Sequence, residues 1–239
     1  MKTILILGAT SPIGAALSEQ FSKGNRIILS GRNQARLSTV ADRCATAGSI
    51  AVRIAPADLA QTIQPIIDAN SEWAIDQIID AASAASGASH VRDLDVAPDA
   101  MRGIIQADVL SHLDLYQQLA RLNRKHPDVA FISTVLAIVK TPGREIYATM
   151  KRMVELYLEK MQLSTPDTRI LVFRVGKLVS ADHDTDSAKQ LAKNVAKAFL
   201  GNKKQVLYGT KGFALKILYV IHPALVSNII RLQRKIRRT

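Results

Sequence analysis

A tyrosine and a lysine four residues apart have the clearest chemical potential in this chain. Tyr147 and Lys151 share one face if their segment is helical, because positions i and i+4 are neighbours on a helix surface. An ammonium beside a phenol favours phenolate, so such a tyrosine can serve as a general acid or base near neutral pH. The spacing alone occurs by chance in many helices. Its meaning therefore depends on the elements that position the pair.

A glycine turn at the N-terminus is the first of these elements. An apolar run over residues 2–7 predicts a buried strand, and Gly8 follows it directly. Ser11 can cap a helix that has Pro12 at its first position, and Gly14 permits close helix–strand packing. N–H groups at such a helix start can face a pyrophosphate. A simple tight turn fits the two glycines equally well, but their place between the first strand and the first helix favours a nucleotide site.

The end of the second predicted strand indicates which dinucleotide would bind. It reads Ser30-Gly31-Arg32, without the acidic residue that would bind the ribose 2′-OH of NAD. Arg32 therefore favours the 2′-phosphate of NADP, so we expect NADP(H) in preference to NAD(H). A solvated surface arginine is the alternative. Asp58 and Leu59, after the third strand, could contact the adenine, although Asp58 could also be a helix N-cap.

Strands and helices alternate along the whole chain. Apolar runs predict seven strands, at residues 2–7, 26–30, 49–54, 77–82, 129–133, 168–175 and 205–208. Helical patterns fall between them, at 12–24, 33–47, 58–68, 98–123, 145–163 and 187–200. This order predicts an α/β fold, with a doubly wound, mostly parallel Rossmann sheet and helices on both faces. We expect one NADP-binding catalytic domain over residues 1–210, with a basic amphipathic extension over 211–239.

Charge is distributed unevenly along the 239 residues. The net charge is +12, and 12 of the 32 Lys and Arg residues lie from Ser187 onward, where no Asp or Glu occurs. A basic C-terminal quarter indicates an anionic surface, ligand or partner rather than nucleic acid, whose binders usually carry the patch in the folded domain. The single cysteine, Cys44, is typical of a reducing compartment, and residues 1–7 are too short an apolar run for a signal peptide. We therefore expect a cytoplasmic protein.

Together these residues resemble the short-chain dehydrogenase/reductase family over residues 1 to about 210. By that resemblance, Tyr147 gives a proton to a substrate carbonyl as hydride arrives from nicotinamide, and Lys151 holds the nicotinamide ribose and supports the phenolate. Thr134, thirteen residues before Tyr147, takes the place of the family's catalytic serine, with Ser133 in reserve. The cofactor-binding set that we expect is Gly8, Thr10, Ser11, Ile13, Gly14, Gly31, Arg32, Asp58, Leu59, Ala81, Ala82, Tyr147, Lys151 and Val175.

The chain departs from the family pattern at several positions. Pro12 replaces a glycine of the cofactor turn, and Val175 replaces a proline near the nicotinamide. The family's Asn-Asn-Ala-Gly is Asp80-Ala81-Ala82-Ser83, where small residues keep room for the cofactor. The asparagine that supports a proton relay aligns with Asp108, and an ionised Asp cannot donate a hydrogen bond. The family's long helices at 98–123 and 145–163 imply a homodimer or homotetramer.

The C-terminal region suggests how substrate could be delivered. Residues 213–230 are strongly apolar but interrupted by polar residues, and residues 223–239 have an apolar and a basic face. Such a tail could lie on an anionic membrane surface at the inner face of the membrane, cover the substrate pocket or a subunit interface, or dock an acidic carrier protein. The acidic run at residues 182–186 has metal-ligand types, but we interpret it as solvated loop charge and expect no metal.

These features lead to one main hypothesis and two rivals. We expect an NADPH-dependent reductase of a carbonyl on a small-molecule, hydrophobic or lipid-linked substrate, such as a keto-sugar. The glycine turn and basic tail also resemble the branch of the family whose reductase completes epimerisation of decaprenylphosphoryl ribose. One rival is a reductase of 3-oxoacyl groups on a carrier protein. The other is a non-catalytic, dinucleotide-binding membrane adaptor, suggested by Asp108 and Ala81.

Overall fold

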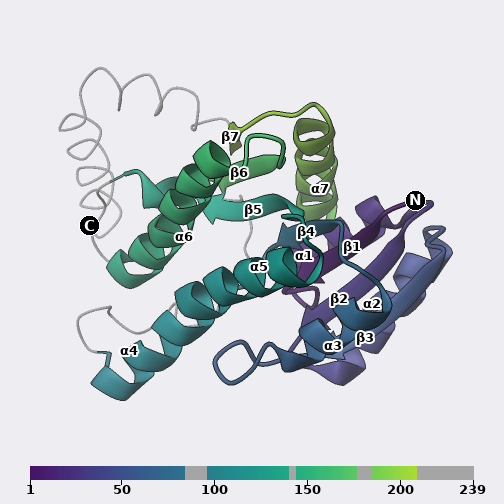
Figure 1. Cartoon of the computed structure of the whole chain (residues 1–239), viewed down its shortest axis with the longest axis horizontal. Helices are drawn as coiled ribbons and strands as arrows, with labels where there is room; N and C mark the ends of the chain where they lie inside the picture. Colours follow the sequence, from purple (N-terminus) through teal and green to yellow (C-terminus); the bar gives the residue numbers. More distant parts are fainter. Residues whose placement is uncertain (84–95, 140–143, 177–184, 209–239) are drawn as a thin grey trace, which may run out of the picture.

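Seven parallel strands form one sheet in the part of the chain that the computed structural model describes, residues 1–83, 96–139, 144–176 and 185–208 (Figure 1). They are β1 (Thr3–Leu7), β2 (Arg26–Gly31), β3 (Ala51–Pro56), β4 (Gln77–Asp80), β5 (Asp128–Thr134), β6 (Ile170–Val175) and β7 (Gln205–Tyr208). Their order is β3-β2-β1-β4-β5-β6-β7. The order reverses at β1, which leaves a crevice at the carboxyl ends of β1 and β4. The predicted doubly wound sheet is confirmed.

The two faces of the sheet each pack against helices. Ile4 and Ile6 of β1 face one core, and Leu5 and Leu7 face the other, because successive side chains of a strand alternate. The first core is covered by α1 (Pro12–Ser22), α2 (Gln34–Thr46) and α7 (Thr185–Leu200). The second is covered by α3 (Gln64–Glu72), α5 (Ser111–Leu122) and α6 (Glu145–Ser164). The strands are therefore buried on both sides, which explains their continuous apolar runs.

The helix predicted over residues 98–123 is interrupted. It consists of α4 (Pro98–Ile105), a π-helical turn η3 (Gln106–Leu110) and α5, which follow one another as one long rod (Figure 1). The backbone N–H of Ser111 bonds to the carbonyl of Gln106, five residues earlier. A π turn inserts an extra residue without changing the apolar pattern enough to reveal it, and such turns often lie at functional sites. This one contains Asp108.

The helix predicted over residues 58–68 is wrong in position. The Asp58 carboxylate accepts a hydrogen bond from the Ala60 N–H, and its carbonyl accepts from Gln61 and Thr62, so this segment is a turn. The helix α3 starts later, at Gln64, with Pro65 in its first turn. Asp58 is therefore not a helix N-cap. None of the helices in the described ranges is both long enough and apolar enough to cross a membrane.

Candidate active site

The turn between β1 and α1 depends on two glycines. Gly8 has φ +71°, and a Cβ there would lie 2.8 Å from the carbonyl oxygen of Ala81. A Cβ on Gly14 would lie 2.1 Å from the carbonyl oxygen of Gly8. Only glycine permits both approaches. They bring the ends of β1 and β4 and the start of α1 into one place.

The start of α1 lies beside this crevice. The Ser11 hydroxyl donates to the Gly8 carbonyl and accepts from the Gly14 N–H, both at 2.9 Å. Pro12 has no N–H, and the Ala15 N–H bonds to the Ser11 carbonyl. The Ile13 N–H has no hydrogen-bond partner within the described ranges, as is usual in the first turn of a helix. This is the geometry that binds phosphate at a helix start.

A cleft of about 290 Å³ lies over this turn. Nine residues of the expected cofactor set line it: Gly8, Thr10, Ser11, Gly31, Arg32, Asp58, Leu59, Ala81 and Ala82. Eight further residues line it: Leu7, Pro12, Ser30, Arg36, Ala57, Ser83, Ala107 and Asp108. The cleft lining does not include Ile13, Gly14, Val175, Tyr147, Lys151, Thr134 or Ser133. Ile13 and Val175 pack against the first core instead.

Arg36 is a charged lining residue that the expected cofactor set does not include. Its N–H bonds to the Asn33 side chain at 2.9 Å, so Arg36 lies in the first turn of α2. Both Arg36 and Arg32 line the cleft, at the end of β2 where an adenosine ribose is expected. The sequence feature that could have indicated Arg36 is Asn33. As the N-cap of α2, Asn33 holds Arg36 in the first turn of that helix, close to the end of β2.

Lys151 joins the helix α6 to the cleft. Its side chain is buried, and Nζ donates to the carbonyl oxygen of Ala82 at 2.8 Å. Nζ also lies 4.6 Å from the centre of the Phe131 ring, within cation–π range. Ala82 lines the cleft, so one residue connects Lys151 to the expected cofactor site.

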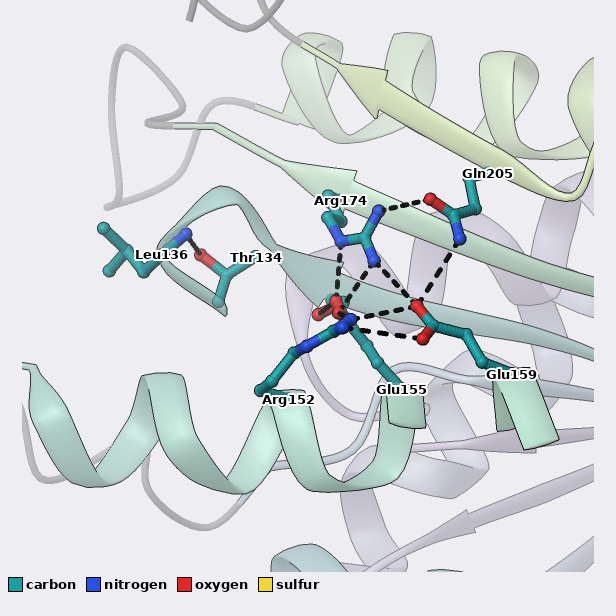
Figure 2. A network of polar contacts seen from close by, with 8 residues as sticks. Thr134, Leu136, Arg152, Glu155, Glu159, Arg174 and Gln205 are labelled. Carbon is teal, nitrogen blue, oxygen red and sulfur yellow. Dashed lines mark hydrogen bonds and ion pairs between the residues drawn. The ribbon is translucent and has the colours of Figure 1, made fainter. Parts of the chain in front are cut away.

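Tyr147 and Thr134 lie on neighbouring elements. Tyr147 is half-buried in the first turn of α6, and the Arg144 guanidinium lies 6.0 Å from the centre of its ring. The helix α6 packs against β5 and against the 3-10 turn η4 (Val135–Ala137) that follows it. The Thr134 Oγ1 accepts from the Leu136 N–H at 3.2 Å, which leaves the hydroxyl proton available to donate (Figure 2).

Ser133 takes part in a different group of contacts. Its hydroxyl donates to Glu155, whose carboxylate also receives the Arg174 guanidinium at 2.8 and 2.9 Å. Gln205 and Glu159 extend this network between α6, β6 and β7 (Figure 2). Adjacent residues of a strand point to opposite faces, so Ser133 and Thr134 belong to different environments.

Asp108 contributes a buried carboxylate to the cleft. It is 3% exposed, and its Oδ2 accepts a hydrogen bond from the Ser83 hydroxyl at 3.0 Å. The π turn η3 brings it there. No group of potential metal ligands occurs among residues 1–83, 96–139, 144–176 and 185–208. The acidic run at residues 182–186 falls outside these ranges except for its last two residues, and the tail over 209–239 lies wholly outside them.

A family model matches most of this sequence. The sequence matches the family model described as short chain dehydrogenase over residues 2–196. A comparison with curated protein sequences found no match.

Solved structures share the fold at low identity. A 7β-hydroxysteroid dehydrogenase structure is 16% identical with a TM-score of 0.83, covering 97% of this chain and 96% of that one. A short-chain dehydrogenase from Sphingobium yanoikuyae in complex with NADPH is 18% identical with a TM-score of 0.74, covering 87% of each chain. A 3-oxoacyl (acyl-carrier-protein) reductase from Agrobacterium tumefaciens with NADP bound is 19% identical with a TM-score of 0.67, covering 85% and 82%.

Proposed function

Because the chain belongs to the short-chain dehydrogenase family, we propose that it is an NADPH-dependent reductase of a carbonyl on a hydrophobic or lipid-linked substrate of the keto-sugar type. Family membership makes it an oxidoreductase that uses a nicotinamide dinucleotide and acts on small-molecule carbonyls. One observation supports the proposed site most strongly. The Lys151 ammonium bonds to Ala82, a residue of the dinucleotide cleft. The catalytic helix and the cofactor cleft are thereby joined.

Three side chains have separate roles in the proposed reaction. Tyr147 donates the proton to the carbonyl oxygen, and Thr134 orients that oxygen through its hydroxyl proton. Lys151 holds the nicotinamide ribose, and its positive charge favours the phenolate that Tyr147 becomes. NADPH, with its adenosine end in the cleft, would supply the hydride. Ser133 is not assigned a role in this scheme, because its hydroxyl is bonded to Glu155.

The cofactor preference is argued from two arginines. Arg32 and Arg36 line the cleft together at the end of β2, and Gly31 before them carries no acidic group. Two guanidinium groups would bind the 2′-phosphate that distinguishes NADPH from NADH. The phosphate bridge would lie at the start of α1, facing the Ile13 N–H.

The substrate class is tested by comparing the kcat/KM values of candidate ketones. Purified protein would be given NADPH with polyprenyl-linked keto-sugars, free keto-sugars and 3-oxoacyl groups on a carrier protein, and kcat/KM would be measured for each. We expect the lipid-linked keto-sugar to have the highest value. A higher value for the carrier-bound acyl group would replace this substrate class by the rival one.

A basic surface that docks on an anionic membrane is proposed for substrate delivery. Lys189, Lys193 and Lys197 recur every four residues on α7 and are exposed, and Lys203 and Lys204 follow them, also exposed. The extension over 211–239 adds seven more basic residues and no acidic one. Such a surface would hold the protein at an anionic membrane, peripherally and on its cytoplasmic side.

Self-association is proposed from exposed apolar residues on two helices. Leu122 of α5 and Met153, Leu156 and Leu163 of α6 are each at least 44% exposed. Burying them against a second copy would remove apolar area from water. Light scattering of the purified chain should give a dimer or tetramer, and a monomer at micromolar concentration would contradict this.

A further inference from the structure

A buried group of polar side chains lies behind Lys151. Asp80 ends β4 and is fully buried, and its Oδ2 contacts both the Tyr116 hydroxyl and the His112 Nδ1. His112 and Tyr116 lie four residues apart on α5, and each is 1% exposed. The proposed reaction assigns no role to any of these three residues. A buried carboxylate with two donors on one oxygen is held in a single orientation.

The other oxygen of Asp80 leads to the catalytic lysine. Its Oδ1 accepts a hydrogen bond from the Ala82 N–H at 3.2 Å. The carbonyl of the same Ala82 accepts from Lys151 Nζ at 2.8 Å. Asp80 therefore fixes the backbone of the residue that holds Lys151.

The surroundings reinforce this arrangement. The His112 ring packs edge-on against Phe131, with centroids 6.4 Å apart, and Phe131 is the ring that Lys151 lies over. Burial acts to raise the pKa of Asp80, but the interactions with His112, Lys151 and Tyr116 outweigh it and hold that pKa below its usual value. Asp80 is thus an ionised acceptor at neutral pH. Burial and the Asp80 carboxylate raise the pKa of Tyr116, which keeps its hydroxyl a donor.

We propose that Asp80, held by His112 and Tyr116, is a positioning residue that sets the place of the Lys151 ammonium through Ala82. The inference rests on the proposed function, in which Lys151 holds the nicotinamide ribose. Asp80 touches neither the cofactor nor the reacting atoms. Its effect should appear on ligands that reach Lys151 and not on ligands that occupy only the adenosine end.

The test compares two ligands in the full-length protein. NADPH extends to Lys151, whereas adenosine 2′,5′-bisphosphate lacks the nicotinamide ribose. Asp80→Ala removes the acceptor for the Ala82 N–H, and it should weaken NADPH binding by about tenfold or more while adenosine 2′,5′-bisphosphate binds as before. Asp80→Asn has a single side-chain oxygen, which can accept from the Ala82 N–H only if Tyr116 and His112 lose their acceptor, so its NADPH affinity should lie between those of the wild type and Asp80→Ala.

Two further variants complete the design. Asn70→Ala removes a buried polar side chain that bonds to Ile75 and Asn123 at the other end of the sheet, so it controls for lost stability and should leave both affinities unchanged. Tyr116→Phe removes one donor to Asp80 with little change of shape. It should weaken NADPH binding by a few-fold, and it keeps the test decisive if Asp80→Ala does not fold.

The outcomes separate this inference from the proposed function. Equal weakening of both ligands in Asp80→Ala and Tyr116→Phe, or no weakening of NADPH in either, would overturn the positioning role. An Asp80→Asn variant that binds adenosine 2′,5′-bisphosphate more weakly than the wild type would also overturn it, because the loss would then not be confined to ligands that reach Lys151. A wild-type chain that binds no NADPH would overturn the proposed function and, with it, this inference.

Discussion

Lys151 owes its position to residues far from it in the sequence. Its ammonium is fixed by the Ala82 carbonyl after β4 and by the Phe131 ring on β5. Tyr147, four residues earlier, lies in the first turn of α6, the helix that packs against β5 and against the turn η4 that follows Thr134. The i, i+4 spacing supplies only the shared helix face. The position of the ammonium is set by β4 and β5, because these strands place the Ala82 carbonyl and the Phe131 ring.

Cofactor selectivity should depend on the two arginines of the cleft. The double variant Arg32→Ala/Arg36→Ala should raise the Kd for NADPH by about tenfold or more, because two charge-assisted contacts to the 2′-phosphate are lost. The Kd for NADH should change little. Fluorescence titration of both cofactors measures the two constants.

Arg43→Ala is the matched control for this prediction. It lies on the same helix α2 but pairs with Glu19 and does not line the cleft. It should leave both constants unchanged. An unaltered ratio of NADPH to NADH affinity in the double variant would remove the two arginines from the site.

The turn from β1 to α1 should not tolerate a side chain at Gly14. Gly14→Ala would place a Cβ 2.1 Å from the Gly8 carbonyl oxygen, so the turn must shift. We expect a loss of roughly 1–3 kcal/mol in the free energy of unfolding, measured by urea denaturation. Cofactor affinity should fall as well.

Gly103→Ala is the matched control on another helix. It lies in α4, and a Cβ there meets no atom within 4 Å. Alanine in a helix interior should stabilise the protein by about 0.5–1 kcal/mol. If the two variants changed stability by similar amounts, close packing at Gly14 would not be the reason for that glycine.

A network of polar side chains joins α6, β6 and β7 (Figure 2). Arg174 is 5% exposed along its side chain, and its Glu155 partner is fully buried. Arg174→Met would leave that carboxylate without its main cation and should cost about 3–5 kcal/mol of unfolding free energy.

The more exposed ion pair of Arg43 and Glu19 provides the comparison with the buried pair of Arg174 and Glu155. Arg43→Met removes the partner of Glu19 from a site where the arginine is 45% exposed, and it should cost about 1 kcal/mol or less. Equal costs in chemical denaturation would show that Arg174 does not compensate a buried charge.

Most elements could be predicted from the sequence because their signals are local. Strand β1 has four apolar residues in a row, and α1 has Ser11 and Pro12 at its start. The π turn at Gln106–Leu110 could not, since one inserted residue leaves the apolar pattern nearly intact. The start of α3 was misplaced because Asp58 stabilises a turn with the same side chain that could cap a helix.

The site was predictable to the extent that its contacts are local. The cleft residues Gly8, Thr10 and Ser11 follow one strand, and Asp58 and Leu59 follow another. Arg36 was missed because its place beside β2 depends on the capping of α2. The contacts of Asp80 with His112 and Tyr116 span 32 and 36 residues, so they depend on how β4 and α5 pack.

The proposed basic surface predicts binding to anionic membranes. The full-length chain should float with anionic vesicles and not with zwitterionic ones, and added salt should release it. Changing Lys189, Lys193 and Lys197 to Gln should reduce the floated fraction, whereas the same change at Lys2, Lys23 and Lys125 should not. Equal partitioning to both vesicle types would refute a role for the basic surface.

The role of Tyr147 as the proton donor can be tested directly by one substitution. Tyr147→Phe removes the phenolic hydroxyl while keeping the ring that packs near Arg144. With a ketone that the wild-type protein reduces, kcat should fall by at least about a hundredfold, since general acid catalysis contributes roughly that much, and the Kd for NADPH should stay within about threefold. NADPH oxidation that continues at the wild-type rate in this variant would contradict the account.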